Sequence, residues 1–461
     1  MAAPLWQSYF WLENRYNIMK NKTGHYKLKR SLGLFELTLY GIGIILGAGI
    51  YALIGVGAGV AGNAVWISFV FAAIIAAFTG LSYAELSSMY PKTAAEYNYT
   101  KNAFKKRSLA FVVGWLMTIA SIVAAVTVAF GFAGYFTHIF GGSITLVAVA
   151  LVMVLSMLNY IGIKVSARFN ILSTLIETAG LLIVIAVGML VFSSSGITVD
   201  LFETPGNAGI TSMLAATAII FFAYLGFEDI VNASEETKNA RKVVPKALVI
   251  SIIISTILYI LVAVSAVNLV GWERLSESKA PLTEAVSSVM PNSDFLFSLI
   301  ALFATANTSL ILLIVGSRIL YGMSSDRAMP RAFSIVGRRG TPYFAVAAVA
   351  IVSVLITLAG NIKTAATITD ISLFVVYIAV NASLIALRYR EPGAKRAFRV
   401  PLNIGKFPVL ALLGLLSAFF MLFYFERDIA AIEAVVIIAG FVAYLILRKS
   451  PRATAGQLSA R

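Results

Sequence analysis

Long hydrophobic runs recur along this chain, each about 20 residues or more and interrupted by few charges. An apolar helix of that length crosses the hydrocarbon core of a bilayer. Twelve spans are predicted, at residues 34–58, 64–88, 108–136, 143–161, 171–193, 209–232, 244–270, 295–322, 341–360, 366–387, 407–425 and 430–447. The pattern therefore predicts an all-α polytopic membrane protein with about twelve transmembrane helices in one bundle.

Composition agrees with a membrane protein and argues against an enzyme. Of the 461 residues, 59% are hydrophobic and 12% are charged, unlike soluble domains. Cysteine is absent and the histidines are His25 and His138, which leaves little for thiol, metal or imidazole chemistry. The sequence contains no P-loop, no His-Glu-x-x-His and no Gly-x-Ser-x-Gly motif. We expect no catalytic residues, no metal site and no cofactor.

The formal net charge of +15 follows from the distribution of basic residues between loops. With a cytoplasmic N-terminus, only Arg274, Lys279, Lys363 and Arg427 lie outside, and 32 of the 36 Lys and Arg lie inside. Basic residues prefer cytoplasmic loops, so both termini are predicted inside a cell membrane. This explains the charge without a nucleic-acid partner. Residues 1–33, aromatic and basic, are predicted as an interfacial or disordered arm.

Glycines interrupt the first predicted span. Gly41, Gly43, Gly47 and Gly49 fall within nine residues of a segment that should be buried in lipid. One explanation is close helix packing through small residues. The other, which we favour, is a helix that unwinds at this point.

The sixth predicted span has a second interruption. Gly226, Glu228 and Asp229 break an apolar run that starts at Phe221. Breaks in corresponding spans of two halves are typical of transporters with inverted repeats, which bind substrate near the bilayer midplane. There, N–H groups at a half-helix start hold anions and free carbonyls hold cations. A zwitterion fits such a site.

Three stretches resemble the amino acid-polyamine-organocation superfamily of permeases, and the resemblance extends from about residue 30 to residue 450. These stretches are Gly47-Ala48-Gly49-Ile50, Ser82-Tyr83-Ala84-Glu85-Leu86 through Pro91-Lys92 to Glu96-Tyr97, and Phe222 through Gly226-Phe227-Glu228 to Ser234-Glu235-Glu236-Thr237-Lys238-Asn239. Together they are specific, whereas each alone is weak.

The resemblance implies a 5+5 inverted repeat with discontinuous helices 1 and 6, two peripheral helices and alternating access. The chain then divides into the cytoplasmic or interfacial arm at 1–33, a ten-helix transport core at 34–387, helices 11 and 12 at 388–447, and a cytoplasmic tail at 448–461.

The resemblance also implies a substrate site at the two breaks. Amino-acid members bind the α-carboxylate through backbone N–H groups of the first break and the α-ammonium through carbonyls of both breaks, next to an aromatic gate that Phe222 matches. The implied substrate-binding residues are Ile45, Gly47, Ala48, Gly49, Ile50, Ala120, Phe222, Ala223, Leu225 and Asn307.

Three departures from the family pattern fall in predicted cytoplasmic loops. Relatives often carry Gly-Gly where this chain has Thr93-Ala94-Ala95, Asn-Pro where it has Asn239-Ala240, and Asp-Gly where it has Asp326-Arg327. These differences concern loop conformation more than the substrate site.

The expected lining of the site indicates a neutral substrate. Ala120 lies five residues after Trp115, where relatives that take cationic amino acids often carry a glutamate. The other expected lining residues are also neutral, namely Ile44, Ile119, Ala124, Asn307 and Thr308. We expect a neutral, small or branched amino acid, because a polyamine lacks the carboxylate that the first break should receive.

Two carboxyl groups within spans are candidates for ion coupling. A charge in mid-bilayer costs at least about 2.5–3.5 kcal/mol, so Glu177 and Glu228 are expected to have a function. Glu177 lies about where many proton-coupled relatives carry a lysine. It is predicted to bind a proton, or sodium with Thr308 and Ser309, the alternative being a packing residue. Glu228 either caps N–H groups of the second break or relays protons.

These features predict a secondary active transporter of amino acids that works by alternating access and proton-coupled symport. Two alternatives on the same fold remain open, an amino acid exchanger and a transporter of cationic amino acids or polyamines. A non-transporting amino acid sensor is an alternative of another class. The expected partners are the amino acid and the lipid bilayer, and the sequence leaves the oligomeric state undetermined.

Overall fold

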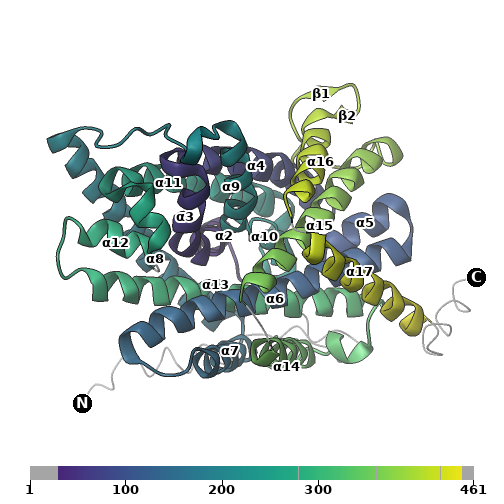
Figure 1. Cartoon of the computed structure of the whole chain (residues 1–461). Helices are drawn as coiled ribbons and strands as arrows, with labels where there is room; N and C mark the ends of the chain where they lie inside the picture. The colour runs from purple at the N-terminus through teal and green to yellow at the C-terminus, as the bar shows by residue number, and fades with distance from the viewer. Residues whose placement is uncertain (1–29, 279, 360–361, 426, 449–461) are drawn as a thin grey trace, which may run out of the picture.

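The computed structural model describes residues 30–448 except 279, 360–361 and 426, so most of the predicted arm and tail lies outside the described residues (Figure 1). The longer helices are α2 Leu34–Leu46, α3 Ala48–Ala61, α4 Val65–Met89, α5 Ala95–Phe104, α6 Arg107–Phe140, α7 Ile144–Ile161, α8 Ile163–Ser195, α9 Ile210–Ile220, α11 Ala240–Glu277, α13 Asp294–Ser325, α14 Tyr343–Ala359, α15 Ile362–Arg390, α16 Val409–Met421 and α17 Arg427–Arg448.

Short elements connect these helices. The short helical elements are η2 Gly62–Ala64, η3 Pro205–Asn207, η4 Phe221–Tyr224, α10 Asp229–Asn232, η5 Ser234–Glu236, α12 Pro281–Ser287, η6 Arg331–Ser334 and η7 Leu422–Tyr424. Two strands, β1 Asn403–Ile404 and β2 Phe407–Pro408, form one antiparallel hairpin, the one sheet among the described residues.

The helices have the length and surface of membrane spans. Ten helical segments of the described residues are long and apolar enough to cross a bilayer, and Tyr343–Leu358 and Val409–Tyr424 are shorter apolar helices. Large hydrophobic side chains such as Met153, Leu190 and Phe423 are exposed on the outside of the bundle. Such a surface is stable only in lipid. The prediction of an all-α polytopic membrane protein is confirmed.

The first span breaks at Gly47. Helix α2 ends at Leu46, α3 starts at Ala48, and Gly47 between them has φ −44° and ψ −137°, which no helix contains. A Cβ on Gly47 would lie 1.5 Å from Thr308 Oγ1, so helix α13 packs directly against the break. The predicted interruption of span 1 therefore exists.

The sixth span breaks over a longer stretch. Helix α9 gives way to the 3-10 turn η4, and one turn of helix resumes as α10. Between them Gly226 has φ +110°, which glycine adopts without strain, and a Cβ there would lie 2.6 Å from Ile44 Cγ1. The glycine thus lets the second break approach the first.

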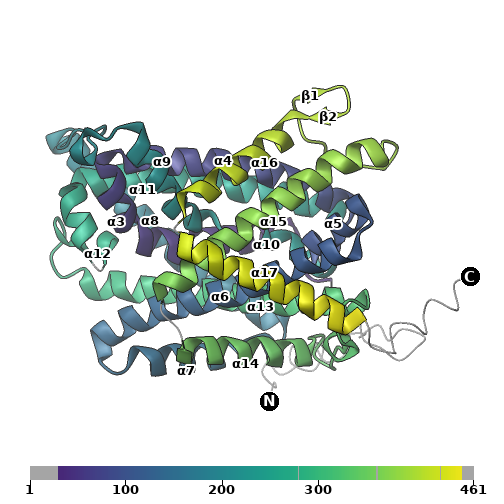
Figure 2. The same ribbon diagram turned by 45° about the vertical axis from the view of Figure 1, so that its right-hand side comes forward.

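Helices five spans apart in the sequence pack against each other. Helix α4 contacts α11, α6 contacts α13, and α7 contacts α14. Figures 1 and 2 both show α7 and α14 side by side along one edge of the bundle. This pairing is the one that two inverted five-helix repeats would produce. Helix α17 lies on the outside of the bundle, where it contacts α6 and α15 (Figure 2).

Helix α5 and the β-hairpin are two of the elements that were not predicted. Helix α5 occupies the loop after span 2 and packs against α6 and α15. Helix α15 continues to Arg390, past the predicted end at 387, and residues 391–408 then carry the β-hairpin before α16. Both elements are too polar for a hydropathy pattern to find.

The departures from the family pattern coincide with left-handed backbone. Ala94 has φ +51°, Asn239 +48° and Arg327 +62°. Two of these positions, Ala94 and Arg327, match glycines of the family pattern, and glycine adopts positive φ at no steric cost. The loops therefore keep the conformation that the glycines would favour, although the residues differ.

Candidate functional site

A cavity lies where the two breaks meet. Both broken spans, α6, α13 and α15 contribute side chains. Its lining residues are Ile44, Ile45, Gly49, Met117, Ala120, Ser121, Ala124, Val128, Phe222, Leu225, Glu228, Asp229, Thr308, Leu312, Thr369 and Leu373. A mostly apolar pocket with a few polar groups is typical of a small-molecule site.

Half of the predicted substrate-binding residues line this cavity: Ile45, Gly49, Ala120, Phe222 and Leu225. Gly47, Ala48, Ile50 and Ala223 belong to the two breaks without lining the cavity, and Asn307 lies elsewhere. Gly49 has a structural role as well, because a Cβ there would lie 2.4 Å from Ala223 Cα. Backbone contact at that position joins the two breaks.

The start of α3 presents N–H groups next to the cavity. The first N–H groups of a helix have no acceptor within it and carry the positive end of the helix dipole. The Ala48 N–H donates to Thr308 Oγ1 at 3.3 Å, and the Thr308 hydroxyl donates in turn to the Ala304 carbonyl at 3.1 Å. The N–H groups of Gly49 and Ile50 follow in the same turn, so an anion in the cavity would face them.

A tyrosine that the sequence analysis missed joins the carbonyls of both breaks. The Tyr259 hydroxyl, from α11, contacts the Ile45 carbonyl and lies 2.8 Å from the Ala223 carbonyl oxygen. Tyr259 is fully buried, and its ring packs against Phe69 and Tyr224. These are carbonyls that the family resemblance gives to the substrate ammonium. Only the fold brings α11 to them, and no local motif marks Tyr259.

Two acids also line the cavity, which the expected neutral lining did not include. Glu228 Oε2 accepts a hydrogen bond from the Gly226 N–H at 3.1 Å, the geometry of the capping role considered for it. Asp229 is buried, and its Oδ1 has no hydrogen-bond partner. The cavity therefore has a carboxylate edge beside a mostly apolar wall.

Glu177 lies behind the first break rather than in the cavity. Its carboxyl is fully buried beside Asn307 and Thr174. Neither carboxyl oxygen has a partner within hydrogen-bond geometry. Asn170 Nδ2 donates to Asn307 Oδ1 at 3.0 Å, so amides fill the space between α8 and α13. No Lys or Arg among the described residues forms an ion pair with Glu177.

Helix α2 closes this polar cluster. A Cβ on Gly43 would lie 2.0 Å from Thr174 Oγ1 and 3.0 Å from Asn307 Nδ2. The Tyr51 hydroxyl of α3 donates to the Glu177 backbone carbonyl at 2.7 Å. Both halves of the broken first span therefore pack against the part of α8 that carries Glu177.

The other two predicted ion ligands have hydrogen-bond partners on other helices. Thr308 lines the cavity and accepts from Ala48, while the Ser309 hydroxyl donates to the Ala125 carbonyl at 3.1 Å on α6. Within the described residues, no group of three or more His, Cys, Asp and Glu side chains is arranged to hold a metal ion.

Comparison with known proteins identifies the family. The family described as amino acid permease matches residues 32–446, which is most of the chain. The chain belongs to the amino acid permease family. It is a multi-pass membrane transporter of amino acids and not an enzyme, as the sequence analysis predicted.

Several relatives share this family. The chain is 30% identical over 420 residues to a branched-chain amino acid permease of Bacillus subtilis (strain 168), with 85% of this chain and 88% of that protein covered. It is 29% identical over 396 residues to a methylthioribose transporter of the same organism, covering 81% and 84%. It is 26% identical over 402 residues to the vacuolar cationic amino acid transporter 4 of Arabidopsis thaliana, covering 82% and 66%.

Proposed function

We propose that this permease carries neutral amino acids with apolar side chains, together with a proton. The apolar wall of the cavity supports the proposal most directly, because Met117, Ala120, Val128, Leu312 and Leu373 offer a side chain only dispersion contacts and exclusion from water. The relative named a branched-chain amino acid permease agrees with it.

The polar ends of the cavity fit the main-chain part of an amino acid. The substrate carboxylate would lie against the N–H groups at Gly49 and Ile50, where the helix dipole favours an anion. The ammonium would lie near the carbonyls of Ile45 and Ala223, where it would join the Tyr259 hydroxyl. The side chain would then extend along the apolar wall.

Proton coupling would use Glu177. A fully buried carboxyl without a paired cation is stable only when protonated or when a cation arrives. Gly43 packs against Thr174 and Asn307 beside Glu177, and Tyr51 donates to the Glu177 backbone carbonyl, so a change in charge at Glu177 would favour a different position of the first span. Proton uptake and the motion of the substrate site would thereby be linked.

We further propose a cell-membrane location with both termini cytoplasmic. The distribution of basic residues carries this orientation, since exchanging the two sides would place 32 of 36 Lys and Arg outside. The bacterial relatives support a cell membrane as the location.

A cationic substrate is the second candidate, because Glu228 and Asp229 line the cavity. Uptake into proteoliposomes separates the candidates. We expect imposed proton gradients, and not sodium gradients, to drive accumulation of labelled leucine, isoleucine or valine, with unlabelled substrate inside accelerating entry. Accumulation of lysine or arginine instead would contradict the proposed substrate, and uptake driven by sodium would contradict the proton as the coupling ion. Equal exchange without accumulation would indicate an exchanger. Binding without any flux would indicate a sensor.

A further inference from the structure

The β-hairpin before α16 has no role in the proposed transport cycle, yet its chemistry is distinctive. Residues 392–408 contain Lys395, Arg396, Arg399 and Lys406 and no acidic residue. Within this segment Leu402 is 68% exposed and Ile404 75% exposed. Figures 1 and 2 show the hairpin projecting away from the bundle at the end of α15 and α16. An exposed apolar tip with only basic charges beside it favours a membrane interface.

The hairpin has a defined shape. Asn403 pairs with Pro408 and Ile404 with Phe407, and the Val409 N–H donates to the Leu402 carbonyl at 3.2 Å. Gly405 has φ +60°, the positive value that tight hairpin turns require at their first central residue. A two-residue turn thus holds Leu402 and Ile404 outward, although a loop in water would gain nothing from exposing them.

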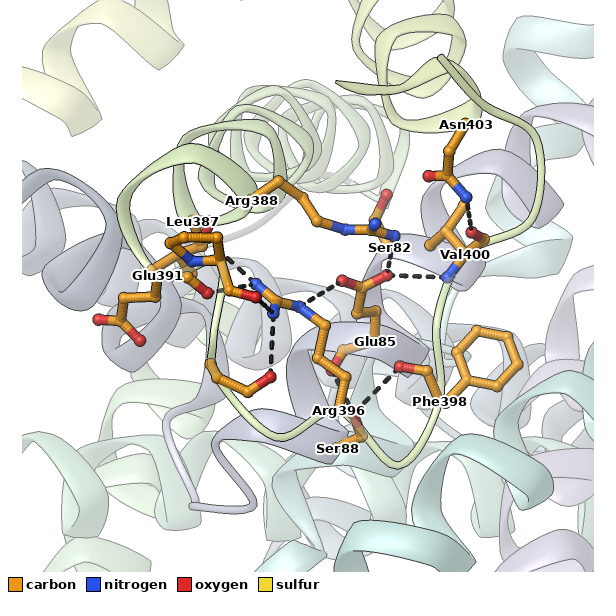
Figure 3. A network of polar contacts seen from close by, with 12 residues as sticks. Ser82, Glu85, Ser88, Leu387, Arg388, Glu391, Arg396, Phe398, Val400 and Asn403 are labelled. Atoms are coloured by element: carbon orange, nitrogen blue, oxygen red, sulfur yellow. Dashed lines mark hydrogen bonds and ion pairs between the residues drawn. The ribbon is translucent and has the colours of Figure 1, made fainter. Parts of the chain in front are cut away.

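A buried ion network fixes the base of this hairpin to the bundle (Figure 3). Glu85 of α4 pairs with Arg388 of α15 at 2.6 Å and with Arg396 at 2.9 Å, and all three side chains are buried. The same carboxylate accepts the Val400 N–H at 2.8 Å. Both ends of segment 396–400 are therefore anchored on α4, and Arg396 is committed to Glu85 rather than to an outside partner.

The remaining basic side chains face outward. Lys395, Arg399 and Lys406 are exposed, and they flank the apolar tip. Helix α16 begins directly after β2 and exposes Leu413, Leu416 and Phe420 on one face, as a lipid-facing helix does. The apolar tip of the hairpin thus comes directly before the lipid-facing apolar stripe of α16. The exposed basic side chains lie beside that tip.

We propose that residues 399–407 form an interfacial element that binds anionic lipid headgroups of the cytoplasmic leaflet. Leu402 and Ile404 enter the interface, and Arg399 and Lys406 contact headgroup phosphates, whose negative charge complements theirs. The proposal relies on the predicted orientation but not on which amino acid is carried. Through Glu85, a bound lipid is mechanically joined to α4, so headgroup composition affects the stability of the bundle.

Single cysteines test this directly, since the natural chain contains none. Ile404→Cys is labelled with an environment-sensitive fluorophore in nanodiscs of phosphatidylcholine with or without phosphatidylglycerol. We expect phosphatidylglycerol to shift the emission of the label to the blue and to let lipid-attached quenchers reduce its fluorescence. Aqueous iodide should quench the label several-fold less than in phosphatidylcholine alone. Arg338→Cys, on another exposed loop at the same predicted side, is the control and should stay accessible to iodide.

A charge-removal pair tests headgroup binding. Arg399→Gln with Lys406→Gln should weaken the phosphatidylglycerol response by roughly fivefold for each charge, whereas Lys105→Gln with Lys106→Gln, exposed elsewhere, should leave it unchanged. Inorganic phosphate should not displace the label from the interface. Equal iodide quenching at 404 in both lipids would overturn the proposal. Headgroup binding would be overturned if the label inserted equally with and without phosphatidylglycerol, or equally in the wild type and the Arg399→Gln, Lys406→Gln variant.

The same variants have an independent readout of folding. Monodisperse protein with a wild-type thermal midpoint in phosphatidylcholine shows that the substitutions leave the bundle intact. Phosphatidylglycerol should raise the midpoint of the wild type and of the Lys105/Lys106 control, and it should do so less for the hairpin variant. A midpoint that rises equally in all three proteins contradicts the link through the hairpin.

Discussion

At the scale of single residues, Glu177 combines full burial with a setting of neutral amides and hydroxyls. Glu177→Gln keeps the size and the hydrogen-bonding groups but fixes the charge at zero. We expect this variant to bind substrate with little pH dependence and to lose accumulation driven by a proton gradient, while exchange persists. Uptake into proteoliposomes with an imposed pH gradient measures it. Undiminished proton-driven accumulation would make Glu177 a packing residue.

Tyr259 is the residue whose single hydroxyl contacts both breaks. Tyr259→Phe removes it and leaves the packing of the ring against Phe69 and Tyr224. Loss of a buried hydrogen bond corresponds to about 1 kcal/mol, so we expect substrate binding weaker by roughly fivefold and a folded protein.

The matched control is Tyr224→Phe. The Tyr224 hydroxyl donates to the Phe69 carbonyl at 3.1 Å, away from the carbonyls of the two breaks. Its loss should lower stability by a similar amount and leave affinity nearly unchanged. Calorimetric titration and thermal melting of both variants separate the two effects, and equal affinities for the two would remove Tyr259 from the site.

At the scale of elements, the contact between α3 and η4 has no room for a side chain. A Cβ at Gly49 would lie 2.4 Å from the Ala223 backbone, so Gly49→Ala must push the two breaks apart. We expect it to lower both the melting temperature and substrate affinity. Gly131→Ala in α6, where the nearest atom would be 3.9 Å away, should instead be neutral or stabilising by up to about 1 kcal/mol. A Gly49→Ala protein with wild-type melting temperature and affinity would show that α3 and η4 can separate to admit a methyl group at no cost, against this prediction.

Helix α5 introduces a titratable contact outside the spans. Burial raises the pKa of Glu96 to about 7, although hydrogen bonds from Asn232 Nδ2 at 3.4 Å oppose the shift. A raised carboxyl pKa means that the neutral form is preferred in the fold, so its contribution is complete below about pH 4.5 and is lost as the pH rises through 7.

Glu96→Gln should abolish that part of the pH dependence. We expect its melting temperature to match that of the wild type near pH 5 and to exceed it at pH 8. The difference in the free energy of unfolding at pH 8 should be at most about 3 kcal/mol. Glu273→Gln, on an exposed helix end, is the control and should change neither value. A Glu96 variant that is equally destabilised at both pH values would mean that the glutamate acts through packing alone.

At the scale of the whole molecule, the predicted orientation distinguishes the two ends of the bundle. Arg338→Cys and Arg427→Cys are exposed positions that should lie on opposite sides of the membrane. An impermeant thiol reagent added to intact cells should label a cysteine at 427 and spare one at 338 until the membrane is opened. The reverse pattern would invert the topology, and with it the leaflet that the hairpin contacts.

The sequence by itself determined the spans, the two breaks and the family. Apolar runs of span length and glycines such as Gly47 and Gly226 are local signals, because lipid requires each helix to satisfy its own backbone and only glycine tolerates φ +110°. The residues of the breaks, including Phe222 and Leu225, followed from those same segments and line the cavity.

Only the tertiary structure decided which distant side chains meet. It moved Asn307 from the cavity to the Glu177 cluster, brought Asp229 to the cavity edge, and placed the Tyr259 hydroxyl on both breaks. It also joined Glu85 to Arg396 across more than 300 residues of chain. Such contacts depend on how helices rotate and cross when they pack, and a hydrophobic pattern fixes the lipid-facing side of a helix but not its neighbours.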